Sequence, residues 1–162
     1  MRLGTYMRMI NEWMGRLSSA ILILMIGIIF YETLARYFFK LPTVWELEVA
    51  IYLMIFITFM GAGWGLKNGV HVSVEVIIQR LSTKNRRILR TILYLIALLT
   101  FLVFFQQCLS TTMTAYFEWW TSWSALEFPL FLVYMFISIG LLLLSLQLCV
   151  EIYEQIAKKD GG

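Results

Sequence analysis

The residues that most often carry chemistry are few in this sequence and stand far apart. It has one histidine, His71, and two cysteines, Cys108 and Cys149. A haem held by two axial histidines would need a second one, and a thiol oxidase would need paired cysteines. A metal site likewise needs three or four ligands brought together. The sequence therefore predicts no enzyme, cofactor or metal site, and we expect His71 to make a capping or interfacial hydrogen bond.

One pair of opposite charges has a spacing that favours contact. Glu32 and Arg36 are four residues apart, so in a helix their side chains lie on one face and can pair. A lone charge deep in a bilayer is costly, which favours pairing near the membrane edge. We expect an ion pair that ends a membrane span. A proton or ion relay and a contact with another subunit are the alternatives.

The elements that position these residues follow from composition. Of 162 residues, 60% are hydrophobic and only 14% are charged, and the mean hydropathy is +0.79. A soluble domain of this size cannot bury so much apolar surface. Four uncharged runs carry it: Leu17–Tyr31, Val49–Leu66, Thr91–Phe117 and Phe128–Val150. These lengths predict an all-α integral membrane protein with four transmembrane helices.

We expect one membrane domain over residues 1–162, with spans at about 13–37, 46–66, 84–117 and 128–151. Between the second and third spans, Val74, Ile77, Ile78 and Leu81 recur at helical spacing and basic residues follow. This favours a short amphipathic helix at about 72–82, lying among the cytoplasmic lipid headgroups. An ordinary cytoplasmic loop is the alternative.

The basic residues indicate how the chain is oriented. Eleven of the 13 Lys and Arg residues fall before the first span, between the second and third, or after the fourth. The positive-inside rule then places both termini in the cytoplasm. Because these charges flank apolar spans and form no solvated basic face, they do not indicate nucleic acid binding. All six tryptophans fall at expected helix ends, as interfacial indoles do.

Small residues mark a packing face in the second span. Gly61 and Gly65 form a G-x-x-x-G pair, which lets helix backbones approach closely. Packing inside this chain and packing against a partner are both compatible with the pattern.

Several motifs, in their order and spacing, resemble a known family. They are Trp45-Glu-Leu-Glu48, Tyr52, Phe59-Met-Gly-Ala62, Lys67-Asn-Gly-Val-His71, Val74-Glu75, the Arg36-Tyr37 pair, and Ala125-Leu-Glu-Phe-Pro129. Together they resemble the small membrane subunit, or Q subunit, of tripartite ATP-independent periplasmic (TRAP) transporters. Leu47 and Ile51 stand where that family has charged residues.

The resemblance implies a sodium-coupled importer in the bacterial inner membrane, with organic acids such as C4-dicarboxylates or sialic acid as substrates. Its partners would be a large transport subunit and a soluble periplasmic binding protein. In that picture the large subunit moves solute by an elevator motion while this chain braces it and holds no solute site.

The resemblance also selects residues for structural roles. The family-motif positions are Arg36, Trp45, Glu48, Tyr52, Gly61, Ala62, Lys67, His71, Glu75 and Pro129. We expect Gly61 and Gly65 at the contact with the large subunit, and Glu118 and Glu127 of the acidic outer loop to help dock the binding protein. A stand-alone four-helix membrane sensor or assembly factor is the alternative function, and a small ion channel is a further competitor.

Overall fold

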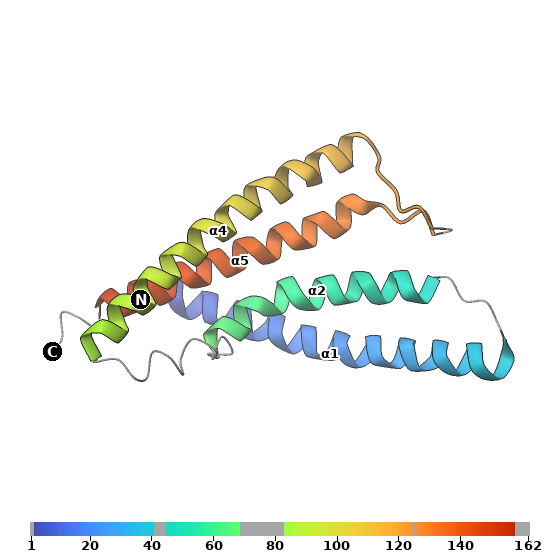
Figure 1. Cartoon of the computed structure of the whole chain (residues 1–162), viewed down its shortest axis with the longest axis horizontal. Coiled ribbons are helices and arrows are strands. Elements are labelled where there is room, and N and C mark those ends of the chain that lie inside the picture. The colour runs from blue at the N-terminus through green and yellow to red at the C-terminus, as the bar shows by residue number, and fades with distance from the viewer. Residues whose placement is uncertain (1, 41–44, 69–82, 125, 158–162) are drawn as a thin grey trace.

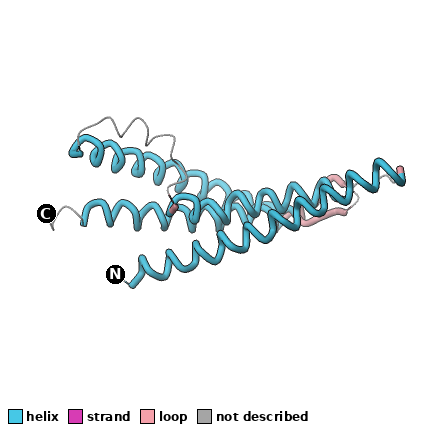
Figure 2. Tube along the Cα trace, turned by 90° about the horizontal axis from the view of Figure 1, so that it is seen from below, coloured by secondary structure: helices cyan, strands magenta, loops and turns pink. Residues whose placement is uncertain are grey.

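The computed structural model describes residues 2–40, 45–68, 83–124 and 126–157, and their regular structure is helical (Figure 2). The helices are α1 (Arg2–Phe39), α2 (Trp45–Lys67), α4 (Thr83–Phe117) and α5 (Leu130–Ala157). The amphipathic helix expected at 72–82, together with His71 and Glu75, lies outside the described residues.

All four of these helices are long and apolar enough to cross a membrane. The all-helical, four-span prediction is therefore confirmed. At about 1.5 Å per residue, α1 with its 38 residues is roughly 57 Å long. Because a hydrocarbon core is only about 30 Å thick, such a helix must tilt or extend beyond it.

The helices lie side by side in the order α4, α5, α2, α1 (Figure 1). The strongest packing joins neighbours in that series, and α1 also touches α5. The N-terminal end of α1 and the C-terminal end of α5 lie at the same end of the molecule, which we call the terminal end. The opposite end, which holds the link between α4 and α5, we call the loop end.

Helix α1 begins well before the expected span at Trp13. A row of buried residues spaced four and then three apart continues the packing face toward the terminal end. Its buried members are Met7, Asn11, Gly15 and Ser18. Opposite them, α2 supplies Gly61 and Gly63. A Cβ on Gly61 would lie 3.3 Å from the Ser18 hydroxyl oxygen, and one on Gly63 would lie 3.0 Å from Cγ of Asn11.

Helix α5 crosses α2 at Gly140, where the two backbones nearly touch. A Cβ on Gly140 would lie 2.6 Å from the carbonyl carbon of Phe59, so only glycine fits without movement. Toward the loop end, aromatic rings fill the wider gap between the helices. Phe56 packs edge-on against Phe136, and the rings of Tyr52 and Phe128 are 4.8 Å apart.

A leucine cluster joins α4 to α2 and α5. Leu66 of α2 and Leu144 and Leu148 of α5 are buried together, and α4 packs against them through Tyr94 and Phe101 among others. Helix α4 is thereby fixed along one side, and the rest of its circumference stays exposed. The layer thus ends at α4 on one edge and at α1 on the other.

Candidate functional site

The described residues of the link between α4 and α5 form a hydrogen-bonded turn. The amide of Ser122 donates to the carbonyl of Phe128 at 2.9 Å, and the amide of Leu130 donates to the carbonyl of Trp120 at 2.9 Å. Thr121 and Pro129 form an antiparallel bridge between these bonds. Pro129 thereby directly precedes Leu130, the first residue of α5.

Glu48 ties this turn to α2. Its carboxylate accepts a hydrogen bond from the Tyr52 hydroxyl on one oxygen and from the Ser124 hydroxyl on the other. Ser124 in turn shares a hydrogen bond of 3.0 Å with Ser122 and accepts one from the Leu126 amide at 3.2 Å. A hydrogen bond to a carboxylate is stronger than one between two neutral groups. This cluster therefore holds the turn in one position.

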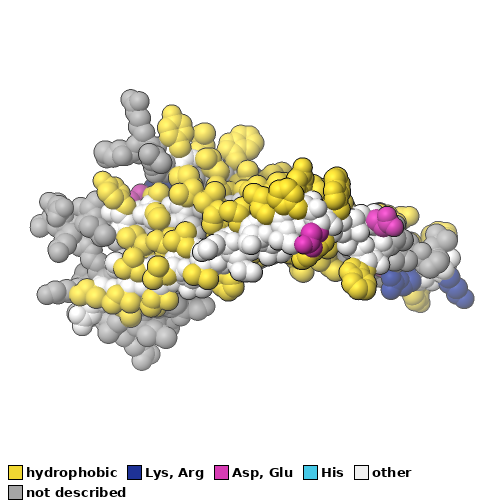
Figure 3. Space-filling view, turned by 90° about the horizontal axis from the view of Figure 1, so that it is seen from above, with side chains coloured by type: hydrophobic (Ala, Val, Ile, Leu, Met, Phe, Trp, Pro, Cys, Tyr) yellow, Lys and Arg dark blue, Asp and Glu magenta, His cyan; other side chains and the backbone are white. Residues whose placement is uncertain are grey.

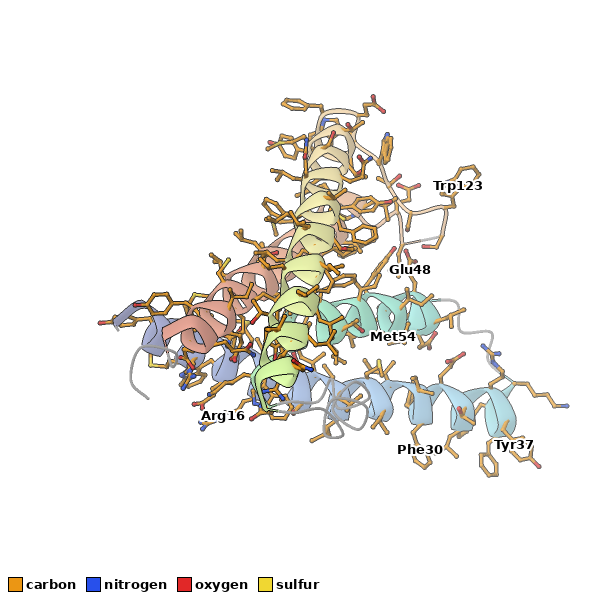
Figure 4. The ribbon with its side chains drawn as sticks, turned by 60° about the vertical axis from the view of Figure 1, so that its left-hand side comes forward. Arg16, Phe30, Tyr37, Glu48, Met54 and Trp123 are labelled. Atoms are coloured by element: carbon orange, nitrogen blue, oxygen red, sulfur yellow. The ribbon has the colours of Figure 1, made fainter. Side chains whose placement is uncertain are left out.

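The fixed turn presents aromatic and acidic side chains outward. Trp123 is fully exposed at its tip and points away from the helices, whereas Glu48 points from α2 toward the turn (Figure 4). Trp119 is also largely exposed, and it sits at φ 52°, a left-handed conformation that ends α4. Glu118 and Glu127 are exposed as well. The structure therefore leaves both predicted docking residues accessible on one ordered element.

The terminal end carries a second polar cluster. Asn11 of α1 and Gln147 of α5 are fully buried, and the Asn11 amide donates to the Gln147 side-chain carbonyl at 2.8 Å. Gln147 then donates to Glu151 at 2.9 Å. One turn further out, Arg8 forms a two-pronged ion pair with Glu154 at 2.6 and 2.7 Å. This cluster joins α1 to α5 across the layer.

Most of the family-motif positions that the structure describes have structural partners within the chain. Arg36 pairs with Glu32, as the spacing predicts. The Lys67 ammonium lies 2.5 Å from a carboxylate oxygen of Glu12. Ala62 packs against the leucine cluster, and Trp45 is the first residue of α2.

The two glycines expected at a partner interface differ in their surroundings. Gly61 packs against Ser18 of α1, so the alternative of packing inside the chain accounts for it. Gly65 is half-buried. Their contact with a large subunit stays a prediction.

Large apolar faces remain uncovered on both edge helices. The most hydrophobic stretch of α4 has no buried residue, and the corresponding stretch of α1 is only 6% buried. Figure 3 views the molecule from the side of α4 and shows apolar side chains spread over that face. On α1, Phe30 and Tyr37 point outward (Figure 4). Such faces require lipid or another membrane protein to cover them.

Within the described ranges no three His, Cys, Asp or Glu side chains gather as metal ligands would. Cys108 and Cys149 are both free thiols, one on α4 and one on α5. The polar clusters join the helices to one another and to the turn, which indicates a structural role.

Comparison with known proteins agrees with these features. Residues 25–158, most of the chain, match the family model described as "Tripartite ATP-independent periplasmic transporters, DctQ component". The chain belongs to the DctQ family. It is thus a multi-pass membrane subunit of a TRAP transporter and not an enzyme, as the motif resemblance predicts.

Three relatives show how far this likeness extends. The sialic acid TRAP transporter permease protein SiaT of Haemophilus influenzae is 23% identical over 99 residues, which are 61% of this chain and 16% of SiaT. The C4-dicarboxylate TRAP transporter small permease protein DctQ of Rhodobacter capsulatus is 39% identical over 44 residues, 27% of this chain and 19% of the relative. The ectoine TRAP transporter small permease protein TeaB of Halomonas elongata is 26% identical over 113 residues, 70% of this chain and 58% of TeaB. In each case the matched stretch covers less than two thirds of the relative.

Some residues that shape this DctQ-family subunit were not found by sequence reasoning. Asn11 precedes the expected first span, and Gln147 lies within the expected fourth span. The available signal was helical spacing: Asn11, Gly15 and Ser18 repeat every three to four residues. The Ser124 hydroxyl bonds Glu48, a contact between distant segments that no local pattern reveals.

Proposed function

We propose that this chain is the bracing subunit of a sodium-coupled importer for organic acids of the C4-dicarboxylate or sialic acid class. It packs against a large membrane subunit that moves the solute and helps a periplasmic binding protein to dock. The subunit resides in the bacterial inner membrane with both termini in the cytoplasm.

The observation that carries this proposal is the combination of family membership with uncovered edge helices. The hydrophobic stretch of α4 has no buried residue within the described chain, so the subunit has an uncovered apolar surface that is available to a membrane partner. SiaT supports the pairing, because the stretch similar to this chain is only 16% of a much longer permease. Relatives named for three different solutes match at 23% to 39% identity, which fits a subunit that does not select the solute.

The acidic turn supports the docking role. Glu118 and Glu127 are exposed on an element that Glu48 holds in place. A fixed negative surface attracts a basic patch on a soluble partner over several ångströms, and salt weakens that attraction.

The test is co-purification from membranes that contain the large subunit of the same transporter. Affinity-tagged chain should recover the large subunit in equal amount, and the chain should accumulate poorly when that subunit is not expressed. A chain that accumulates normally and purifies alone from the same membranes would instead support the stand-alone sensor or assembly factor.

A further inference from the structure

One face of α4 carries polar side chains that are mostly exposed in the described chain. We define the α4 polar patch as Gln106, Gln107, Ser110 and Thr114. The first three are exposed and Thr114 is half-buried. The Thr114 hydroxyl donates to the backbone carbonyl of Ser110 at 3.2 Å, so its hydrogen bond is made within α4. Neither glutamine amide has a hydrogen-bonding partner among the described residues.

The patch points away from the rest of the subunit. Thr112 marks the opposite side of the helix, because its hydroxyl lies 3.3 Å from that of Ser138 on α5. Successive helical residues are rotated by about 100°, so Ser110 and Thr114, each two positions from Thr112, project on the other side.

The depth of the patch makes this exposure costly. Trp119 and Trp123 stand at the loop end of α4, where indoles mark the membrane interface. Gln107 lies twelve residues before Trp119, which is about 18 Å along the helix at roughly 1.5 Å per residue. Since the hydrocarbon core is about 30 Å thick, both glutamines lie near its middle. An amide there that is left facing lipid tails lacks all its hydrogen bonds.

We propose that the α4 polar patch is the surface on which a membrane-embedded helix of the large subunit packs, with backbone or side-chain groups of that helix bonding Gln106 and Gln107. The inference rests on the proposed function and assigns one face of the subunit to the partner. Lipid cannot satisfy the amides at this depth. The large subunit is favoured over a second copy because in SiaT a stretch similar to this chain belongs to a far longer permease polypeptide. The other edge helix, α1, differs in its exposed side chains. Those of Ile23, Ile26 and Phe30 are apolar and can face lipid.

Site-specific photocrosslinking in membranes that contain the complete transporter tests this assignment. A photoreactive amino acid at Val103, Gln107 or Ser110 should give an adduct with the mass of this chain plus the large subunit. The same group at Ile23, Ile26 or Phe30 should give at least tenfold less of it. Adducts of two copies of this chain from the patch would overturn the proposal in favour of a homodimer. Absence of protein adducts from the patch, with strong adducts from α1, would also overturn it.

A pair of substitutions gives a second readout. Replacing both Gln106 and Gln107 with leucine should lower recovery of the large subunit by about threefold or more, because interhelical hydrogen bonds in membranes have modest strength. The melting temperature of the isolated subunit should not fall, since both side chains are exposed and neither amide has a hydrogen-bonding partner among the described residues. Thr33→Leu, an exposed threonine on α1 whose hydroxyl bonds only its own helix, is the matched control and should leave recovery unchanged. Unchanged recovery with both glutamines replaced would contradict the proposal.

These outcomes distinguish a failure of the proposed function from a failure of the α4 polar patch as the contact surface. If unsubstituted chain fails to recover the large subunit, the proposed function fails. If it recovers the large subunit but the crosslinks arise from α1, only the assignment of the α4 polar patch fails.

Discussion

The Asn11 side-chain amide donates a hydrogen bond of 2.8 Å to the Gln147 side-chain carbonyl, and both residues are fully buried. These residues are 136 positions apart in the sequence. They connect the first helix to the last at the terminal end, where Gly63 of α2 makes room for Asn11. Together with the Arg8–Glu154 ion pair, this contact joins two helices that are not neighbours in the series α4, α5, α2, α1.

Removing either amide should destabilise the subunit. Gln147→Leu leaves the buried Asn11 amide without its acceptor and should cost about 1–2 kcal/mol of unfolding free energy. A double-mutant cycle with Asn11→Leu measures the coupling, which we expect to be about 0.6–1.7 kcal/mol. Reversible unfolding in mixed micelles is the measurement. Strictly additive losses would show that the two amides are not coupled.

The crossing of α2 and α5 depends on glycine at position 140. Gly140→Ala should lower the melting temperature in detergent, because the added Cβ would lie 2.6 Å from the backbone of Phe59 and force the helices apart. Gly27→Ala is the matched control, since nothing lies within 4 Å of a Cβ there. That change should be neutral or stabilising by up to about 1 kcal/mol, because alanine favours a helix. Equal effects of the two substitutions would contradict the close crossing.

The link between α2 and the turn at the loop end depends on the Glu48 carboxylate. Glu48→Ala removes the acceptor of both the Tyr52 and Ser124 hydroxyls and should free the turn. We expect faster hydrogen exchange at the Ser122 and Leu126 amides by about tenfold, the equivalent of about 1.4 kcal/mol. Thr121→Ala, an exposed position in the same turn, should leave the rates unchanged. Unaltered exchange in Glu48→Ala would show that the backbone bonds of the turn hold it without α2.

The acidic side chains of that turn should affect uptake only through long-range attraction. Reversing both charges, Glu118→Lys with Glu127→Lys, should reduce uptake several-fold at low ionic strength. The difference should shrink at about 0.5 M salt, where the Debye length falls below about 5 Å. Glu118→Gln is the control, because its amide oxygen still accepts from the Trp120 indole, which bonds Glu118 at 2.7 Å. If charge reversal leaves uptake unchanged at low salt, these residues have no part in docking.

The sequence predicts the spans well, because their signal is local. Long apolar runs between charged residues place all four helices, and the i, i+4 spacing of Glu32 and Arg36 predicts their ion pair. Contacts between distant segments are harder to predict. Nothing near Ser124 indicates that its hydroxyl reaches Glu48, and nothing near Gly140 indicates that Phe59 crosses there. The early start of α1 was underestimated because Arg2–Arg16 is polar, although Asn11, Gly15 and Ser18 face α2 and α5.

The same contrast applies to the candidate sites. Glu118 and Glu127 were predicted on the outer link from charge alone, and the structure places both on an ordered turn. The pair Gly61 and Gly65 was selected for its spacing, yet Gly61 faces Ser18 in the same chain. A G-x-x-x-G motif shows that a backbone can be approached closely, and it carries no information on which helix approaches.

The central claim, that this chain braces a transporter and moves no solute itself, is tested most directly by solute accumulation in reconstituted vesicles. Vesicles should be prepared with this chain alone, with the large subunit alone and with both, and supplied with binding protein, a C4-dicarboxylate or sialic acid, and a sodium gradient. We predict accumulation only when both membrane subunits are present. Accumulation by vesicles that contain this chain alone, or equal uptake by the large subunit without it, would contradict the account.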